Sequence, residues 1–283
     1  MQEKICDLHI HSNCSDGTCS PEELIDIAEQ AGLYAVALCD HNTVKGLRRF
    51  LNAAKGKDII AIPGVEVSCQ FKSKEVHILG LFLKEDVFDD LESFFVELNI
   101  RKMESNEILL ENLNKAGYKI DIQDVFDLSE SGIPNRVHFA KVLLNKGYVS
   151  SIDEAFKSLL SKDGGIYIES KKLEAFETIK YLSEIDAVPV IAHPLQSLSL
   201  EEVEEFLPQA KELGLVGMEC IYPLYDEVKT RQAHQLAESF DMKVSRDSDF
   251  HGENKPNIHI GVGENNIKVP FSVYEGLNPY FKD

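Results

Sequence analysis

Near its start the chain carries the segment Ile5-Cys6-Asp7-Leu8-His9-Ile10-His11-Ser12. Its apolar first part has the length and composition of a buried strand, which we expect over Ile5–Ile10. Side chains alternate along a strand, so His9 and His11 share one face at a spacing that suits ligands of one ion. The segment therefore predicts a strand that ends in candidate metal ligands.

Units of one strand and one helix repeat along the chain after this segment. A helix is expected to begin after Ser20, with Pro21 in its first turn and Glu23 three residues after the cap, and to stop at Gly32. Further buried strands are expected at Ala35–Cys39, Ile59–Val67, Glu75–Leu83, Val188–Ala192, Gly217–Ile221 and Lys243–Arg246. Repeated units of this size favour a parallel α/β barrel or an open parallel sheet.

The alternation of strands and helices stops between residues 88 and 164, where charged segments with helical spacing of apolar residues replace the strands. We expect a small helical insertion domain over 88–164, inserted in a barrel formed by 1–87 and 165–283.

Composition narrows the class of protein. The chain has 283 residues, of which 43% are hydrophobic, and a formal net charge of −19. This charge argues against a protein that coats nucleic acid or binds duplexes stably, because such proteins need basic surfaces. The start has no signal-like apolar segment, no apolar run would span a bilayer, and the six cysteines form no CxxC pair. A cytoplasmic protein is expected, with no membrane association and no obligate protein partner.

Ionisable residues gather at the ends of the expected strands. Besides the first histidine pair, they are Asp16, Asp40, His41, Glu66, His77, His193, Asp249 and His251. Taken singly, His77 is better explained as a core histidine and Asp16 as part of an ordinary turn. As a set they are hard to explain structurally, because the carboxyl ends of barrel strands converge on one rim. Imidazoles and carboxylates suit Mn, Fe or Zn, and a pair of such ions would activate a hydroxide for attack on a phosphate ester.

The same residues carry a family likeness. The segments around His9, His41, Glu66, His193 and Asp249 resemble the motifs of the PHP (polymerase and histidinol phosphatase) superfamily, with the match running from about Ile5 to Gly252. This resemblance implies a distorted (β/α)7 barrel that holds up to three Mn, Fe or Zn ions. It implies that His9, His11, Glu66 and Asp249 hold one ion.

By the same resemblance, Glu66 bridges to a second ion with His77 and His193, while Asp16, His41 and His251 hold a third. The catalytic residues are expected to be Glu66, Asp249 and His193. Asp40 is expected to orient a ligand or a water molecule.

The insertion resembles that of stand-alone PHP phosphoesterases that act on nucleotides. Arg136-Val137-His138-Phe139 matches a segment that faces the active site in that subgroup. Arg136 is expected to bind a non-reacting phosphate, and His138 a phosphate or base; the alternative for Arg136 is a surface salt bridge. Members often have a Gly-Gly pair where this chain has Arg246-Asp247, and Arg246 is a third candidate for substrate binding.

The resemblance to this subgroup implies a hydrolase that acts on a small phosphorylated substrate: a nucleoside 3′,5′-bisphosphate, a 5′-monophosphate or a short RNA 5′ end. One alternative is a histidinol-phosphate phosphatase, which would keep the same ligands. An alternative of another class is a non-catalytic metal-binding module, which the full set of ligands disfavours.

Overall fold

The computed structural model describes residues 4–129, 134–161, 166–167, 173–262 and 269–279. Contacts divide the chain into two compact units, Met1–Glu92 with Lys172–Asp283, and Ser93–Lys171. The boundaries predicted from the sequence lie at 88 and 164. The first division falls inside a single helix, α3 (Phe88–Lys115), which no local change in composition would reveal.

The first unit is built on one sheet, whose order is β8-β7-β6-β4-β3-β2-β1-β9, with β5 paired to β3. Its strands in the described residues are β1 (Ile5–Ile10), β2 (Leu33–Leu38), β3 (Ile60–Phe71), β4 (Lys74–Leu81), β5 (Leu173–Glu174), β6 (Val188–Ala192), β7 (Gly217–Ile221), β8 (Lys243–Arg246) and β9 (Val269–Pro270). The predicted strands at β6, β7 and β8 are confirmed residue for residue.

The two ends of this sheet approach each other beyond β8. The His11 N–H donates to the Phe250 carbonyl at 2.9 Å, and the Asp249 N–H donates to the His9 carbonyl at 3.0 Å. Ile10 and Phe250 thereby form a parallel bridge. The sheet is thus curved into a nearly closed barrel, and the predicted α/β barrel is confirmed.

β4 departs from the parallel pattern that the repeats favoured. It runs antiparallel to β3 and to β6. Lys72 and Ser73 join β3 to β4 with φ angles of 48° and 67°, and two residues with positive φ form the tight turn typical of a hairpin. Because no crossover helix separates these strands, they must be antiparallel.

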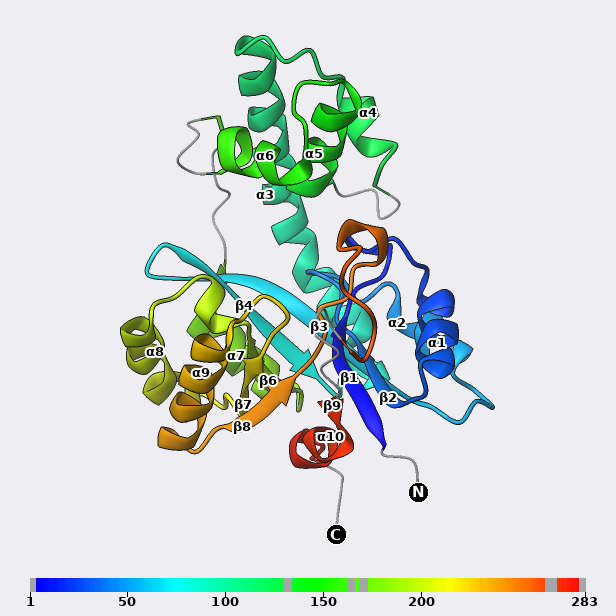
Figure 1. The fold of residues 1–283 in the computed structure, drawn as a ribbon, viewed down its shortest axis with the longest axis vertical. Helices are drawn as coiled ribbons and strands as arrows, with labels where there is room; N and C mark the ends of the chain where they lie inside the picture. The colour runs from blue at the N-terminus through cyan, green and yellow to red at the C-terminus, as the bar shows by residue number, and fades with distance from the viewer. Residues whose placement is uncertain (1–3, 130–133, 162–165, 168–172, 263–268, 280–283) are drawn as a thin grey trace. The chain divides into compact units, whose positions relative to one another are not determined.

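Helices cover the outside of the barrel sheet (Figure 1), with α1 and α2 beside the first strands and α8 and α9 beside the last. Their bounds are α1 (Pro21–Gln30), α2 (Leu47–Ala53), α7 (Ala175–Glu184), α8 (Leu200–Glu212), α9 (Glu227–Ser239) and α10 (Phe271–Leu277). The predicted capping box at the start of α1 is confirmed, since the Ser20 side chain accepts from the Glu23 N–H and Glu23 accepts from the Ser20 N–H.

Apolar side chains from the strands form the core of the first unit. The cluster joins β1, β2, β3, β4 and β6, and Tyr274 and Leu277 of α10 pack against it. α10 was not predicted, because its short segment shows little periodicity. This core fixes the strands, so the ligand-bearing residues at their ends are held on a rigid frame.

All the regular secondary structure in the described residues of the second unit is helical. It contains most of α3 with α4 (Ile122–Phe126), α5 (Arg136–Asn145), α6 (Ile152–Ala155) and a π-helical turn, η2 (Phe156–Leu160). Its own core includes Leu109, Phe139, Leu143 and Leu160. Within the described part of the chain, every helix is too short or too polar to cross a membrane.

Candidate metal centre

Strand ends deliver the predicted ligands to one place in the first unit. His9 is the last but one residue of β1, Glu66 and His77 lie within β3 and β4, and the others lie in the segments that follow β1, β2, β6 and β8. Between Asp7 and Ile10 the register of β1 against β2 shifts, as at a β-bulge. Bulges re-aim side chains beside functional sites, and this one lies at His9.

Glu66 is the centre of this arrangement, and its two carboxylate oxygens face different histidines. Oε1 lies 2.7 Å from His77 Nδ1 and 3.2 Å from His193 Nε2. Oε2 lies 3.1 Å from His9 Nε2, 3.2 Å from His11 Nε2 and 3.1 Å from His41 Nδ1. The side chain is only 1% exposed. A carboxylate with imidazoles on both oxygens has the geometry of a bridge between two cations.

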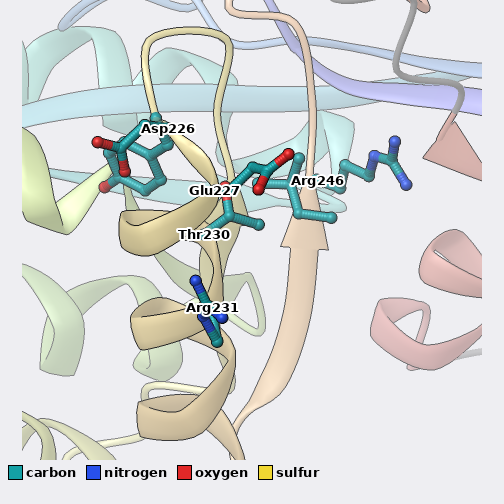
Figure 2. A pocket seen from close by; sticks show the side chains of 7 residues that line it. Asp226, Glu227, Thr230, Arg231 and Arg246 are labelled. Carbon is teal, nitrogen blue, oxygen red and sulfur yellow. The ribbon is translucent and has the colours of Figure 1, made fainter.

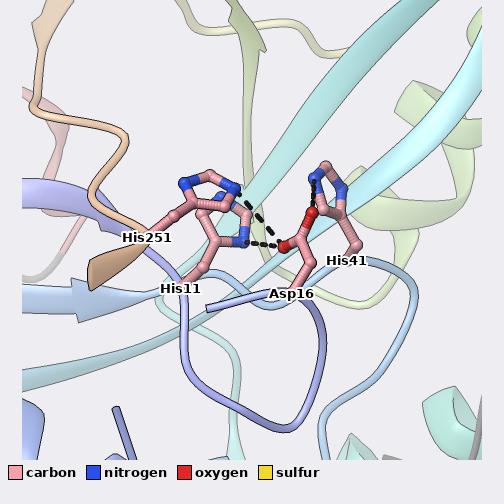
Figure 3. Close-up of side chains that lie close together, drawn as sticks. All are labelled: His11, Asp16, His41 and His251. Atoms are coloured by element: carbon pink, nitrogen blue, oxygen red, sulfur yellow. Dashed lines mark ion pairs between the residues drawn. The ribbon is translucent and has the colours of Figure 1, made fainter. Parts of the chain in front are cut away.

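Asp16 forms a second centre with three histidines, which converge on its carboxylate in Figure 3. Its oxygens lie 3.3 Å from His251 Nε2, 3.7 Å from His11 Nδ1 and 3.8 Å from His41 Nε2. The sequence grouped Asp16 with His41 and His251 but not with His11. His11 faces both centres, because its Nε2 points to Glu66 and its Nδ1 to Asp16.

Asp249 lies on the other side of His11, with Oδ1 3.2 Å from His11 Nε2. Its Oδ2 accepts a hydrogen bond from the Tyr222 hydroxyl at 2.8 Å and lies 2.5 Å from Lys255 Nζ. One oxygen thus points to the histidines while the other is held by two donors. Neither Tyr222 nor Lys255 was predicted, because nothing in their sequence surroundings distinguishes them from other tyrosines and lysines.

Strained backbone accompanies these residues. His193 and Asp249 have φ angles of 29° and 51°, and Asn42, next to His41, has a φ of 48°. Such conformations cost of order 1–3 kcal/mol each for residues with a side chain, and they persist where the surroundings impose them for function.

The side chains fit a set of bound cations. His11 Nδ1, His41 Nδ1 and Glu66 Oε2 are buried and lack a hydrogen-bond partner. His9 and His11 also bring their Nε2 atoms within 2.9 Å of each other. Unpaired polar atoms in a protein interior are costly, and cations bound at the two centres would satisfy them. The chemistry of the donors, neutral imidazoles with carboxylates, suits divalent transition metals.

The carboxylates of Glu66 and Asp16 are held in their charged form. Burial acts to raise the pKa of Glu66, but attraction to His41 and His9 outweighs it and holds that pKa well below its usual range. Burial likewise opposes ionisation of Asp16, whose pKa His251 and His41 nevertheless hold well below its usual range. Ionised carboxylates are the form that binds cations.

Asp40, expected to orient a ligand or a water, supports a loop. It accepts hydrogen bonds from the Ser12 N–H at 2.8 Å and from the Ser12 and Ser15 hydroxyls, each at 2.6 Å. These bonds fix the loop that leads from β1 to Asp16. Asp40 therefore acts on the site through the position of Asp16.

Arg136 and His138 belong to α5, in the second unit. The Arg136 guanidinium lies 4.6 Å from the centre of the Tyr167 ring, and its Nη1 donates to the Leu160 carbonyl at 3.3 Å. His138 is buried, and its Nδ1 accepts from the Asn135 N–H at 3.0 Å, within the cap of α5. Both side chains thus contact their own unit, and their contacts with substrate stay predictions.

Arg246, in β8, lines a cavity of about 790 Å³ together with residues of α9, among them Glu227 and Arg231. None of the proposed metal ligands lines that cavity. Figure 2 shows the Arg246 and Arg231 side chains pointing in different directions, so they do not form a joint anion site. The side chain of the next residue, Asp247, lies on the side of the metal centre, with Oδ1 3.9 Å from His9 Nδ1.

Glu219 was missed by the sequence analysis. It lies in β7, fully buried, with Oε1 2.8 Å from His9 Nδ1. His9, Glu219 and Asp247 bring their ligand atoms within 4.8 Å of one another. Burial and the negative charge of Glu219 raise the pKa of Asp247 well above its usual range. A charged residue inside the apolar strand Gly217-Met218-Glu219-Cys220-Ile221 is itself a signal, since unpaired carboxylates are rarely buried.

A curved α/β barrel with a buried cluster of histidines and carboxylates at its strand ends defines a class of metal-dependent hydrolases. The family model described as the PHP domain matches residues 7–170, more than half of the chain. The chain belongs to the PHP family.

Relatives of known name cover nearly the whole chain. A 5′-3′ exoribonuclease of Haemophilus influenzae is 31% identical over 87% of this chain and 89% of its own length. A phosphoribosyl 1,2-cyclic phosphate 1,2-diphosphodiesterase of Eggerthella lenta is 27% identical over 90% of this chain and 97% of its own.

Among solved structures, a Bifidobacterium adolescentis protein assigned as a metal-dependent phosphoesterase superposes with a TM-score of 0.84. It is 25% identical, and the match covers 97% of this chain and 96% of that one. The match therefore includes residues of both compact units.

Proposed function

We propose that this chain is a metal-dependent phosphoesterase that hydrolyses phosphate esters of nucleotides: nucleoside 3′,5′-bisphosphates, 5′-monophosphates or short RNA 5′ ends. The observation that carries this proposal is Glu66, whose two oxygens face imidazoles from β1, β4 and the segments after β2 and β6. A buried carboxylate shared in this way is expected where cations lie side by side.

We assign the ligands to up to three divalent ions of Mn, Fe or Zn. His9, His11, Glu66 and Asp249 would hold one, and Glu66, His77 and His193 a second. Asp16, His41 and His251 would hold a third, with His11 facing it as well. When bound, such ions supply a water nucleophile that ionises near neutral pH, and they neutralise charge on the phosphoryl oxygens.

The protein's own groups prepare this chemistry. Tyr222 and Lys255 hold Oδ2 of Asp249, which leaves Oδ1 directed at the histidines. Lys255, which is 30% exposed, also adds a positive charge where an anionic substrate would approach. Glu66, Asp249 and His193 are the residues that we place next to the reacting phosphate.

The substrate class rests on the relatives and on the insertion. The name of the Haemophilus influenzae relative specifies RNA, and that of the Eggerthella lenta relative a phosphoribosyl group. Phosphates attached to ribose are common to both. We propose that the helical insertion caps the substrate, with Arg136 and His138 as its candidate contacts, and that Arg246 of β8 is a further candidate. We also propose that the enzyme acts in the cytoplasm without an obligate partner.

A phosphate-release screen tests the proposal. The metal-loaded protein would be offered nucleoside mono- and bisphosphates, 5′-phosphorylated RNA oligomers, a ribose cyclic phosphate and histidinol phosphate. We expect the fastest turnover on a nucleotide or RNA 5′ end, and loss of that turnover in Asp249→Ala. A large preference for histidinol phosphate would overturn the substrate class. Metal-loaded protein inactive on every phosphoester would instead favour a non-catalytic module.

A further inference from the structure

Glu219 contacts two of the proposed ligands at once. Its Oε1 lies 2.8 Å from His9 Nδ1, and its Oε2 accepts the His193 backbone N–H at 2.7 Å. The side chain is 0% exposed. One carboxylate therefore connects the end of β1 to the residue after β6, and it uses one oxygen for each contact.

The contact with His9 determines which ring nitrogen is free. In a neutral His9 that carries its hydrogen on Nδ1, this hydrogen is donated to Glu219 and Nε2 keeps its lone pair. That Nε2 is the atom that lies 3.1 Å from Glu66 and 3.8 Å from Asp249. A carboxylate behind a histidine ligand fixes its orientation and raises its basicity toward a cation.

The contact with His193 acts on the backbone. His193 has φ 29° and ψ 52°, a conformation that is unfavourable for a residue with a side chain. The bond from its N–H to Glu219 stabilises this conformation, which brings His193 Nε2 within 3.2 Å of Glu66 Oε1. His9 and His193 face different oxygens of Glu66, so Glu219 supports both sides of the proposed bridge.

We propose that Glu219 is a positioning residue, which sets the ring orientation of His9 and the backbone of His193 so that both present Nε2 to the metal ions. This inference rests on the proposed metal centre. It assigns to a single buried carboxylate the alignment of ligands that belong to two ions.

Glu219→Gln is the sharpest test, because it keeps the shape of the side chain but has only one acceptor oxygen. Two donors, His9 Nδ1–H and the His193 N–H, then compete for one oxygen, and the amide nitrogen faces a donor. We expect the affinity for Mn²⁺ or Zn²⁺, measured by titration of metal-free protein, to fall roughly 10- to 100-fold. The loss would appear in metal affinity even when saturating metal restores most of kcat.

Asp247→Asn is the matched control, since it removes a carboxylate from the same buried cluster. Asp247 Oδ1 lies 3.9 Å from His9 Nδ1, beyond hydrogen-bond distance, and has no hydrogen-bond partner. Because Asp247 makes no hydrogen bond to His9, Asp247→Asn is expected to keep its metal affinity within about threefold of the wild type. Equal losses in both variants would overturn the positioning role, as would an unchanged affinity in Glu219→Gln.

Two further measurements keep the test decisive. Should Glu219→Gln fail to fold, as seen by circular dichroism, Glu219→Asp keeps the charge but shortens the side chain, and the same loss of affinity is expected. Wild-type affinity in Glu219→Asp would then overturn the proposal. Elemental analysis of the wild type separates the two hypotheses: protein that binds no metal refutes the metal centre itself, whereas metal-replete wild type leaves Glu219 alone to be judged.

Discussion

Lys255 Nζ lies 2.5 Å from Oδ2 of Asp249, so a partly exposed cation is paired with a buried carboxylate of the proposed metal centre. Its charge weakens cation binding by repulsion, but it attracts an anionic substrate. The two effects have opposite signs, and they can be measured separately.

Lys255→Met is therefore expected to bind Mn²⁺ somewhat more tightly while kcat/KM for a nucleotide falls roughly tenfold, in keeping with the loss of one charge near the site. Metal titration and steady-state kinetics at saturating metal give the two numbers. Lys229→Met, which removes a lysine that donates to the Leu195 carbonyl, is the control and should change neither. If Lys255→Met lowered metal affinity and turnover together, Lys255 would be a structural support only.

Substitution of Glu66 and of His251 should remove different numbers of ions. Glu66 faces five histidines, whereas His251 faces the centre formed around Asp16. Elemental analysis of Glu66→Gln is expected to show loss of at least two of the ions, and that of His251→Ala loss of one. Equal stoichiometry in the two variants would show that Glu66 is not shared.

Removal of metal should lower stability as well as activity. Cations that bind only the folded protein stabilise it by about 2.7 kcal/mol at a hundred times their Kd, which corresponds to roughly 5–10 °C in melting temperature. We expect a chelator to abolish phosphate release and to lower the Tm by this amount, and added metal to restore both. A Tm that does not respond to metal would argue against ions bound among these buried residues.

Asp40→Ala should loosen the loop that carries Asp16. Three donors from Ser12 and Ser15 lose their acceptor, and buried groups left unpaired cost about 1–3 kcal/mol. Urea unfolding is expected to show this loss of stability. Metal titration is expected to show that the ion assigned to Asp16 is lost first. Ser15→Ala, which removes one of the three bonds, should have a smaller effect of the same kind; an effect as large as that of Asp40→Ala would contradict this account.

Arg136→Ala distinguishes a substrate contact from a structural one. The guanidinium lies 4.6 Å from the Tyr167 ring centre, a contact worth about 0.5–1 kcal/mol at an exposed site. If Arg136 binds a phosphate of the substrate, its loss raises KM for a nucleoside bisphosphate roughly tenfold, the value of one charge-assisted hydrogen bond. Tyr167→Leu removes the ring but keeps the cation, so it should lower stability without this rise in KM. Equal KM values in the two variants would assign Arg136 to the fold.

Much of the site was predictable because its signals are local. The histidines and carboxylates stand at the ends of apolar strands, and strand ends converge in a barrel. Hydrophobic periodicity and the Ser20 cap therefore predicted the strands β6, β7 and β8 and the start of α1. The hairpin of β3 and β4 escaped this reasoning, because Lys72 and Ser73 are not typical residues for positive φ.

Sequence by itself determined the fold class, the family and the candidate ligands, since each depends on residue types at short spacings. Only the tertiary structure decided that His11 faces two centres, that Asp40 holds a loop, and that Glu219 contacts both His9 and His193. Glu219 lies 210 positions from His9 in the chain. No local pattern records such a contact, because the packing of β7 between its neighbours, and not the sequence around Glu219, determines which side chains its carboxylate meets.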